Sequence, residues 1–519
     1  MKPLAVEDLT VEQKVGQMLF ARRPRNERNK RELLDMIHDR RLGGLHLSPH
    51  EDAGDYLSTA DYPLLLADNM ESGFEGPEAT PLPCQQAIGA IGDPAAAADW
   101  ARITAIDAKS AGRNTVFGPI LDVARNPLSS CVGPRAFGAN PELVARLAVE
   151  TVREYQRQGM VVTAKHFPGF GQSPVDSHIG MVHMTGEKQT LLKRDLLPYQ
   201  RCIEQADLSG VMVGHIIADD IDSEMPATLS PKVIDLLREM GFDGLVVTDS
   251  LAMIGLTSRF GLRRSHELAM AAGNDMIITS YRLSPAEAYG MMLNAYRKGC
   301  IGDEQLDASV ARVLTAQQRT LTSVEQSGKG DADRQKAAEL TRRSISAITS
   351  PGASPSIDPQ AEHLFLLQVG NTFTDPQTGK VHAEGEDPAG LLDCVARLFG
   401  NSRVLRINDF PSRNQMERAC VETTGAESVV AVCRSRTDHY MGSSELTRRM
   451  LALLDGIGNR LSAVVLLGNA YAARELPPAP RLILGYEGGD APKAALEALA
   501  GVFQPRGTPP VATGLSPAR

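Results

Sequence analysis

Charged side chains gather at one short stretch of the chain, where an apolar run gives way to a polar loop. Lys165 and His166 end the run VVTAKHF, and glycines and a proline follow in FPGFG. A few residues later the loop carries Asp176 and His178. A cation, a carboxylate and two imidazoles can bind a polar substrate and exchange protons with it. Because such groups follow a buried strand where it opens into a loop, the stretch predicts a catalytic site.

Other apolar runs in the first 320 residues also end in polar side chains. These runs are continuous in hydrophobicity, as expected for parallel strands covered on both faces, and helical segments lie between them. Eight strands alternating with helices predict an α/β fold, and either a (β/α)8 barrel of TIM type or a doubly wound sheet fits the pattern. The barrel is favoured because it gathers the polar strand ends at one rim. The expected strands are 15–20, 43–47, 63–68, 115–122, 161–167, 210–215, 244–249 and 275–280, and their polar ends are Asp68, Asp122, Lys165, His166, His215, Asp249 and Ser280.

A change in composition divides the chain into two expected domains. Residues 322–336 (TSVEQSGKGDADRQK) are polar and glycine-bearing, and they predict a linker between a barrel at 1–321 and a second domain at 337–519. The second domain repeats the α/β pattern on a smaller scale and is expected to be a three-layer α/β/α sandwich. Its expected strands are 364–369, 403–406, 428–433, 462–467 and 481–485, with an amphipathic helix at 444–455.

The bulk properties of the chain argue against several classes of protein. The net charge is −9 and no long Lys/Arg run occurs, so nucleic acid is not an expected partner. No apolar run is long enough to span a membrane, and the first residues lack the pattern of a signal peptide. The seven cysteines show no CxxC spacing, which speaks against a zinc site and fits a reducing cytoplasm. No GxGxxG or Walker loop stands in a suitable context, so neither a metal nor an organic cofactor is expected.

Longer ordered matches connect these motifs to a known family. The segments LTVEQKVGQMLF (9–20), NPLSSCVGPRAFGANPELV (126–144), AKHFPGFG with VDSH, and MPATLSPKVIDLLREMGFDGLVVTDSLAM (225–253) resemble glycoside hydrolase family 3. Within that family they are most similar to the NagZ-like bacterial β-N-acetylglucosaminidases. The resemblance implies retaining hydrolysis of terminal β-linked N-acetylglucosamine in glycosides or muropeptides, by a cytoplasmic enzyme of cell-wall recycling or amino-sugar catabolism.

The resemblance also implies a role for individual residues. Asp249 matches the nucleophile, and Asp176 with His178 matches an acid/base dyad. A retaining glycosidase needs a nucleophile on one face of the sugar and a proton donor on the other. A carboxylate ionised at neutral pH suits the first role, and an imidazole, with an ordinary pKa of about 6.5, suits the second. Residues expected to hold the sugar are Asp68, Arg135, Lys165 and His166, with His215 as a further candidate at the rim; Asp122 is expected to hold its loop together.

The chain departs from the family pattern beside these residues. The usual Asp-x-Glu-Gly-Gly-Arg reads DNMESGF from Asp68, so its arginine is missing. Phe170 stands where Lys-His-Phe-Pro-Gly-His-Gly has its second histidine, and Gly171-Gln172-Ser173 replaces a Gly-Asp-Thr run. These changes surround the sugar and its leaving group, so they bear on substrate choice more than on reaction type.

Three alternatives to hydrolysis of N-acetylglucosaminides stay open. Phosphorolysis is one, because an anionic acceptor meets less repulsion from a histidine than from a carboxylate acid/base. Another is the same mechanism on a different sugar. The third is a relative that binds glycans without turnover. The role of the second domain and the existence of a homodimer are left open as well.

Overall fold

The chain divides into two compact units. The structure, a computed structural model, describes residues 2–129, 132–321, 330–370, 390–435 and 446–514, with the backbone of 373–374 and 381–382. One unit comprises Met1–Thr80 and Asp93–Arg334, and the other comprises Pro81–Gly92 and Gln335–Arg519. The sequence patterns gave no sign that the short segment Pro81–Gly92 groups with the second unit.

The expected linker 322–336 contains the start of a helix. Its first eight residues, 322–329, lie outside the described part of the chain. The helix α14 then begins at Asp331 and runs Asp331–Ser344. Acidic residues occupy its first turn and Arg342 and Arg343 its last, which is the charge order that a helix dipole favours. The polar composition of 322–336, which predicted a linker, therefore also includes the first, solvent-exposed turns of the helix α14.

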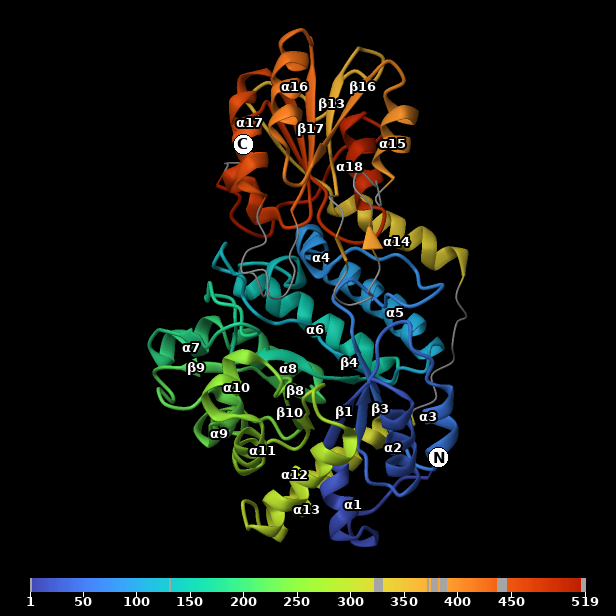
Figure 1. Cartoon of the computed structure of the whole chain (residues 1–519), viewed down its shortest axis with the longest axis vertical. Helices are drawn as coiled ribbons and strands as arrows, with labels where there is room; N and C mark the ends of the chain where they lie inside the picture. Colours follow the sequence, from blue (N-terminus) through green and yellow to red (C-terminus); the bar gives the residue numbers. More distant parts are fainter. Residues whose placement is uncertain are drawn as a thin grey trace. The chain divides into compact units, whose positions relative to one another are not determined.

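Parallel strands form the centre of the first unit (Figure 1). Two hydrogen-bonded sheets have the orders β11-β1-β2-β3-β4-β5 and β10-β8-β6. Backbone bonds join them on both sides, from Lys165 N to Pro119 O (3.1 Å) and from Thr248 N to Met276 O (3.0 Å). The result is a curled parallel sheet in an α/β fold. The strands are β1 Leu19–Arg22, β2 Gly44–His46, β3 Leu65–Asn69, β4 Thr115–Phe117, β5 Val161–Val162, β6 Ala164–Phe167, β8 Gly210–Val213, β10 Leu245–Thr248 and β11 Ile277–Ile278, with a separate pair β7 Val182–Met184 and β9 Ile216–Ala218.

Helices connect these strands and begin at sequence signals. The helix α6, for example, starts at Pro141 because the Asn140 side chain accepts hydrogen bonds from the N–H groups of Glu142 and Leu143. Its buried side, which includes Leu147 and Tyr155, faces the core. The helices of the first unit are α1 Val11–Gln17, α2 Glu27–His38, α3 Gly54–Thr59, α5 Pro94–Ser110, α6 Pro141–Arg157, α7 Lys188–Arg194, α8 Leu197–Ala206, α9 Pro231–Glu239, α10 Ile254–Phe260, α11 Leu262–Ala271, α12 Pro285–Arg297 and α13 Asp303–Arg319.

Two expected strands differ from the structure by more than two residues at one end, and the expected strand 161–167 is divided into β5 and β6. The prediction of a strand at 15–20 was wrong in its first half, because α1 continues to Gln17 and the strand begins only at Leu19. A capping box between Thr10 and Gln13 starts that helix. Short apolar runs do not distinguish a buried helix turn from a strand. The expected strand 115–122 ends at Phe117, just before Pro119, which has no N–H for the ladder.

Apolar side chains on the concave face of the curled sheet form a core of their own. Phe20 of β1 packs against Phe117 of β4 with ring centroids 5.1 Å apart. Met212 and Val247 belong to the same cluster from the other sheet. Because a one-residue slip would turn these side chains outward, their burial fixes the register of the strands. That register decides which residues stand at the carboxyl ends.

The second unit contains a six-stranded sheet in the order β12-β19-β18-β17-β13-β16. All its neighbouring strands are parallel except β12 and β19. The five expected strands are confirmed within about two residues at each end, whereas β12 was missed. The elements are β12 Ser346–Thr349, β13 Leu364–Val369, β16 Arg403–Asn408, β17 Val429–Arg434, β18 Leu461–Leu467 and β19 Arg481–Leu484, with α4 Gln85–Ile91, α15 Leu391–Leu398, α16 Arg413–Thr424, α17 Arg448–Gly456 and α18 Ala491–Leu499, and a hairpin of β14 Phe373–Thr374 and β15 Val381–His382.

The amphipathic helix expected at 444–455 corresponds to α17, and its first two expected residues lie outside the described part of the chain. Among the helices that the structure describes, none has the length and apolar character needed to cross a membrane.

Candidate active site

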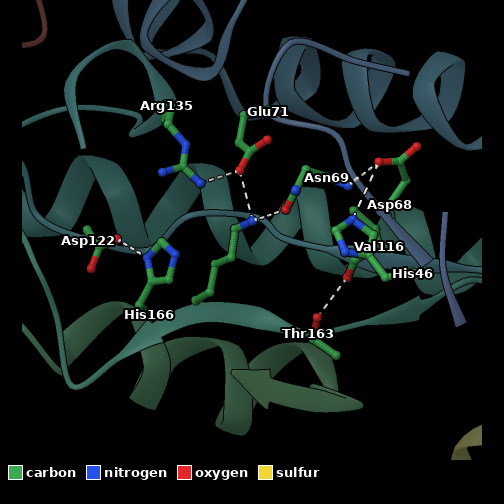
Figure 2. A network of polar contacts seen from close by, with 10 residues as sticks. His46, Asp68, Asn69, Glu71, Val116, Asp122, Arg135, Thr163 and His166 are labelled. Atoms are coloured by element: carbon green, nitrogen blue, oxygen red, sulfur yellow. Dashed lines mark hydrogen bonds and ion pairs between the residues drawn. The ribbon is translucent and has the colours of Figure 1, made fainter. Parts of the chain in front are cut away.

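A buried ion network joins the carboxyl ends of β3 and β6 (Figure 2). Lys165, in β6, donates from Nζ to Oδ1 of Asn69 at 2.6 Å and lies 2.8 Å from Oε1 of Glu71. Arg135 donates from Nη2 to the same Glu71 oxygen at 2.7 Å. Two of the expected sugar residues, Lys165 and Arg135, are therefore held together by a carboxylate that the sequence analysis had not assigned.

Burial and charge oppose each other in this network. Burial alone would raise the pKa of Glu71, but Lys165 and Arg135 hold that pKa far below its ordinary range. Burial lowers the pKa of Lys165, which Glu71 partly offsets. One carboxylate between two cations leaves an excess of positive charge and donors. Such a cluster can hold the hydroxyl groups of a bound ligand in fixed positions.

Asp68 stands beside this network and keeps one oxygen without a partner. Its Oδ1 accepts a hydrogen bond from the N–H of Asn69 at 2.8 Å. Its Oδ2 is buried and has no hydrogen-bond partner among the described residues. Burial raises the pKa of Asp68 to about 8. His46, at the end of β2, lies 3.9 Å from Oδ1, and burial lowers the pKa of this histidine well below its usual value. A buried, unpartnered carboxyl oxygen is suited to a ligand hydroxyl.

The imidazole of His166 is held from two sides. Its Nδ1 lies 2.8 Å from Oδ2 of Asp122, and the other oxygen of Asp122 accepts the N–H of Phe170 at 2.7 Å. The Phe170 ring meets the imidazole edge-on, with centroids 4.9 Å apart. Asp122 was expected to hold its own loop together, and these two contacts instead bind it to the segment of His166 and Phe170. Since Nδ1 is engaged, Nε2 is the atom that His166 can offer to a ligand.

The loop between β6 and β7 brings Asp176 and His178 together. Oδ1 of Asp176 lies 2.7 Å from Nδ1 of His178 and also accepts the backbone N–H of His178 at 2.8 Å. The Asp176 side chain is fully buried, whereas 18% of the His178 side chain is exposed. Because Nδ1 is committed to the carboxylate, proton exchange with a ligand falls to Nε2.

Asp249 follows β10 and is buried close to three imidazoles. Its Oδ1 accepts the N–H of Ser250 at 2.6 Å. Burial acts to raise the pKa of Asp249, but His166, His215 and His178 outweigh it and hold that pKa below its ordinary range. Asp249 in turn offsets part of the lowering of the Lys165 pKa that burial causes. Asp249 therefore lies near other expected site residues, and its lowered pKa means that the carboxyl group is ionised at neutral pH.

Both ring nitrogens of His215 are engaged by the protein. Nδ1 lies 2.8 Å from Oγ1 of Thr228, and Nε2 lies 2.8 Å from the carbonyl oxygen of Ser250. The side chain is completely buried. This geometry favours a positioning role for His215, on the turn that carries Asp249, over direct contact with a sugar.

Sequence reasoning missed three polar residues of this rim: His46, Asn69 and Glu71. A signal was present for two of them. His46 is the last residue but one of the expected strand 43–47, and Glu71 follows Asn69 at the spacing of the family's Asp-x-Glu pattern. Within the ranges that the structure describes, no group of three or more His, Cys, Asp or Glu side chains is arranged to hold a metal ion.

Comparisons with known proteins find related sequences. Residues 10–316 match the family model described as the N-terminal domain of glycosyl hydrolase family 3. The chain is 34% identical over 274 residues to a β-N-acetylglucosaminidase/β-glucosidase of Cellulomonas fimi, which covers 50% of this chain and 48% of that protein. It is 32% identical over 271 residues to a β-hexosaminidase of Nitrosomonas eutropha, covering 51% and 72% of the two chains. The chain thus spans about half the length of the first of these relatives.

Solved structures show the same fold. A glycoside hydrolase family 3 β-N-acetylglucosaminidase from Paenibacillus sp. FPU-7 superposes with a TM-score of 0.84 at 24% identity, covering 98% of this chain and 100% of that one. A β-glucoside phosphorylase superposes with a TM-score of 0.84 at 20% identity, covering 98% and 95%. At such identities the likeness concerns the fold alone, whereas the family model covers more than half of the sequence. The chain belongs to glycosyl hydrolase family 3.

Proposed function

We propose that this protein is a retaining exo-β-N-acetylhexosaminidase that releases terminal β-linked N-acetylglucosamine through a covalent intermediate on Asp249. The observation that carries the proposal is the buried Asp249 carboxylate, held ionised by the imidazoles of His166, His215 and His178. The relatives named β-hexosaminidase and β-N-acetylglucosaminidase support the choice of sugar. Muropeptides that end in this sugar are the substrates that we propose within the class.

The first unit, in this proposal, is a closed (β/α)8 barrel of TIM type. The backbone bonds that join its two parallel sheets on both sides support closure. The second unit is an α/β/α sandwich built on its six-stranded sheet. Catalytic residues then stand where barrels of this type carry them, at the carboxyl ends of the strands.

The first chemical step forms the intermediate. An Asp249 oxygen attacks the anomeric carbon while the bond from that carbon to the leaving oxygen breaks. His178, protonated at the start, gives the Nε2 proton to the leaving oxygen and becomes neutral. Asp176 accepts the Nδ1–H bond throughout, so it stabilises the imidazolium and fixes the direction of Nε2.

The second step returns the enzyme to its starting state. Nε2 of the neutral His178 takes a proton from water, and the water oxygen attacks the anomeric carbon. The ester bond to Asp249 breaks, and the carboxylate leaves with its electron pair. Two displacements at one carbon restore the original configuration, so the sugar is released with its anomeric centre retained.

Preorganised donors and acceptors hold the sugar during both steps. An ammonium group has three N–H donors, and Lys165 uses two of them on Asn69 and Glu71, which leaves one for a hydroxyl. Oδ2 of Asp68 and Nε2 of His166 supply further contacts. Because these groups are fixed before the sugar arrives, little reorganisation is needed when the transition state forms.

The test of this proposal is the Asp249→Asn variant on an aryl β-N-acetylglucosaminide. We expect kcat to fall by roughly 10⁴–10⁶-fold, since loss of a covalent nucleophile lies at the upper end of this range. Asp243→Asn is the matched control, since Asp243 is an exposed acid just before β10. Mass spectrometry of the wild-type enzyme quenched during turnover should find a glycosyl adduct on the peptide that contains Asp249.

Undiminished turnover by Asp249→Asn would contradict the mechanism. A panel of aryl β-glycosides, with and without phosphate, separates the remaining alternatives. Preference for another sugar would point to the altered residues around Phe170. Binding of amino sugars by calorimetry with no cleavage of any panel member would identify a glycan-binding relative without turnover.

A further inference from the structure

The first turn of α10 carries a glycine that the proposed reaction does not use. Gly255 is the second residue of this helix, six positions after Asp249. Its backbone does not lie in the left-handed region that favours glycine. Glycine also stabilises a helix less than alanine does. Neither backbone conformation nor helix propensity therefore explains a glycine at this position.

Gly255 lies against the loop that carries Asp176 and His178. A β-carbon on Gly255 would stand 2.2 Å from the carbonyl oxygen of Gly180 and 2.9 Å from that of Ser177. Both distances are below 3.0 Å, and real β-carbon contacts essentially never come so close. The obstructing atoms belong to the backbone, so no rotation of a side chain can make room for a β-carbon. The loop can occupy this place because residue 255 has no side chain.

The loop forms a tight turn around His178 at this contact. The N–H of Gly180 donates to the carbonyl oxygen of Asp176 at 2.9 Å, which closes the turn. His178 lies between Ser177 and Gly180, the two residues whose carbonyl oxygens approach Gly255. A shift of this hydrogen-bonded turn therefore moves the imidazole with it.

The helix side of the contact is anchored in the first unit. The N–H of Asp249 donates to the carbonyl oxygen of Val213 in β8 at 2.9 Å. The N–H of Leu251 donates to the carbonyl oxygen of Ile278 in β11 at 3.0 Å. Leu251 and Leu256 are both fully buried in one apolar core cluster. The turn that carries Asp249 and the start of α10 thus form one anchored segment.

The loop side of the contact has less apolar packing. Val175 and Ile179, which flank the proposed acid/base pair, are 38% and 45% exposed. Ser177 is buried, and its hydroxyl lies 3.5 Å from Sδ of Met253, which is a weak acceptor. Of the two sides, the loop is therefore the one that moves when a side chain is placed between them.

We propose that Gly255 is a positioning residue for the proton donor: its missing side chain lets the loop pack against α10, and this packing sets the separation between His178 and Asp249. The inference rests on the proposed glycosidase function, because it assigns to Gly255 a spacing that the first chemical step requires. In that step the nucleophile and the proton donor flank the same glycosidic bond.

The experiment introduces the smallest side chain at this contact, in the variant Gly255→Ala. To bring the carbonyl oxygen of Gly180 from 2.2 Å to 3.0 Å, the loop must retreat by about 0.8 Å. We expect kcat/KM for phenyl β-N-acetylglucosaminide to fall by about 10- to 100-fold, since a misplacement of roughly 1 Å has effects of this size. The loss should be much smaller for the dinitrophenyl glycoside, whose leaving oxygen needs no proton. Loss of folded protein would lower both rates by the same factor, so the ratio of the two rates is unaffected by stability.

Gly290→Ala is the matched control. Gly290 lies inside the helix α12, and a β-carbon there would meet no atom within 4 Å. Both rates of this variant should stay close to wild type. The double variant Gly255→Ala/His178→Gln tests whether the effect passes through the imidazole, because such a loss adds little once His178 is gone.

The outcomes separate this inference from the proposed function. If His178→Gln shows the contrast between leaving groups and Gly255→Ala shows none, the inference is overturned and the glycosidase mechanism stands. Additive losses in the double variant also overturn it, since Gly255 then acts through another group. If His178→Gln shows no contrast, the acid role of His178 fails, and the inference fails with it.

If wild type cleaves neither glycoside, the proposed function fails, and crystal structures of wild type and Gly255→Ala decide whether Gly255 sets the position of the loop. Retreat of His178 from Asp249 in the variant supports that part of the inference, and an unmoved loop overturns it.

Discussion

The residues proposed to hold the sugar and the proposed acid/base pair are built in opposite ways. Lys165 and Asp68 are buried in strands, and the partners that fix them include Asn69, 96 residues away from Lys165. Asp176 and His178 sit in a loop and are two residues apart. The first group depends on the tertiary fold for its geometry, whereas the second obtains its geometry from local hydrogen bonds.

This difference predicts how each region fails. Removing one member of the buried network leaves a charge without its partner inside the protein, so the folded state itself is weakened. Removing the imidazole of the loop leaves the backbone in place, because Asp176 still accepts a backbone N–H. Substitutions in the strand network should therefore lower the unfolding free energy, and substitutions of the loop histidine should lower the catalytic rate.

Between these two regions, the largest effect is expected for His178→Gln on glycosides with poor leaving groups. Without a proton donor, kcat/KM should fall by about 10²–10⁴-fold, because general acid catalysis is lost. The loss should be much smaller for a nitrophenyl glycoside, whose leaving oxygen needs no proton. Steady-state kinetics on both substrates measures the contrast.

The chain supplies a matched control for this histidine. His183 also pairs through Nδ1 with an aspartate, Asp219, at 3.0 Å, but more than half of its side chain is exposed. His183→Gln should leave both rates close to wild type. Equal losses for His178→Gln on good and poor leaving groups would exclude His178 as the acid and weaken the contrast between loop and strands.

The next largest effect is expected for Lys165→Met. Glu71 then keeps only Arg135, and Oδ1 of Asn69 loses its donor. Breaking a buried ion pair in this way typically costs about 3–5 kcal/mol of unfolding free energy. Chemical denaturation of the folded protein measures this loss, and KM should rise as well.

A second substitution separates the two consequences of losing Lys165. In Lys165→Met/Glu71→Gln the carboxylate that lost Lys165 is gone, and Arg135, whose side chain is 20% exposed, faces a neutral amide. Part of the stability should therefore return while the weak sugar binding persists. If Lys165→Met unfolds no more easily than wild type, the network contributes nothing to the fold, and the proposed difference between the regions fails.

The polar residues at strand ends could be predicted from sequence, because a polar side chain next to an apolar run shows both the kind of residue and its position at the end of a strand. Asp249 follows the parallel strand β10, and Lys165 and His166 lie in the parallel strand β6, directly after the apolar strand β5. The register of parallel strands brings such ends to one edge without further information. The contact between Asp176 and His178, the proposed acid/base pair, could be predicted as well, since a spacing of two residues already brings the two side chains together.

The remaining features depend on contacts between distant segments, which local patterns do not encode. Glu71 bonds to Arg135 across 64 residues, and nothing near Glu71 indicates that partner. Both ring nitrogens of His215 have partners only because Thr228 and Ser250, which come from different segments, lie beside the ring. The helix α1 was assigned in part to a strand because a buried helical turn and a buried strand share the same apolar composition.

The smallest effect concerns Asp68 and the pH dependence of stability. Burial raises the pKa of this carboxyl to about 8 in the folded protein, against about 3.9 in an unfolded chain. Between these values the folded state keeps a proton that the unfolded state has released. The unfolding free energy therefore falls as pH rises through this window, and the contribution of Asp68 is complete below pH 3.9 and lost above about 8.

Asp68→Asn should remove this dependence, because the amide stays neutral at every pH. We expect the Tm of the variant relative to wild type to be a few degrees higher at pH 9 than at pH 5, measured by calorimetry. Asp61→Asn is the control. Arg40 lowers the pKa of the exposed Asp61, so its titration lies below pH 5 and the difference in Tm should not change over this range. If the difference in Tm between Asp68→Asn and wild type is the same at pH 5 and pH 9, Asp68 is already ionised at pH 5. The buried network would then hold two charged carboxyl groups, Asp68 and Glu71.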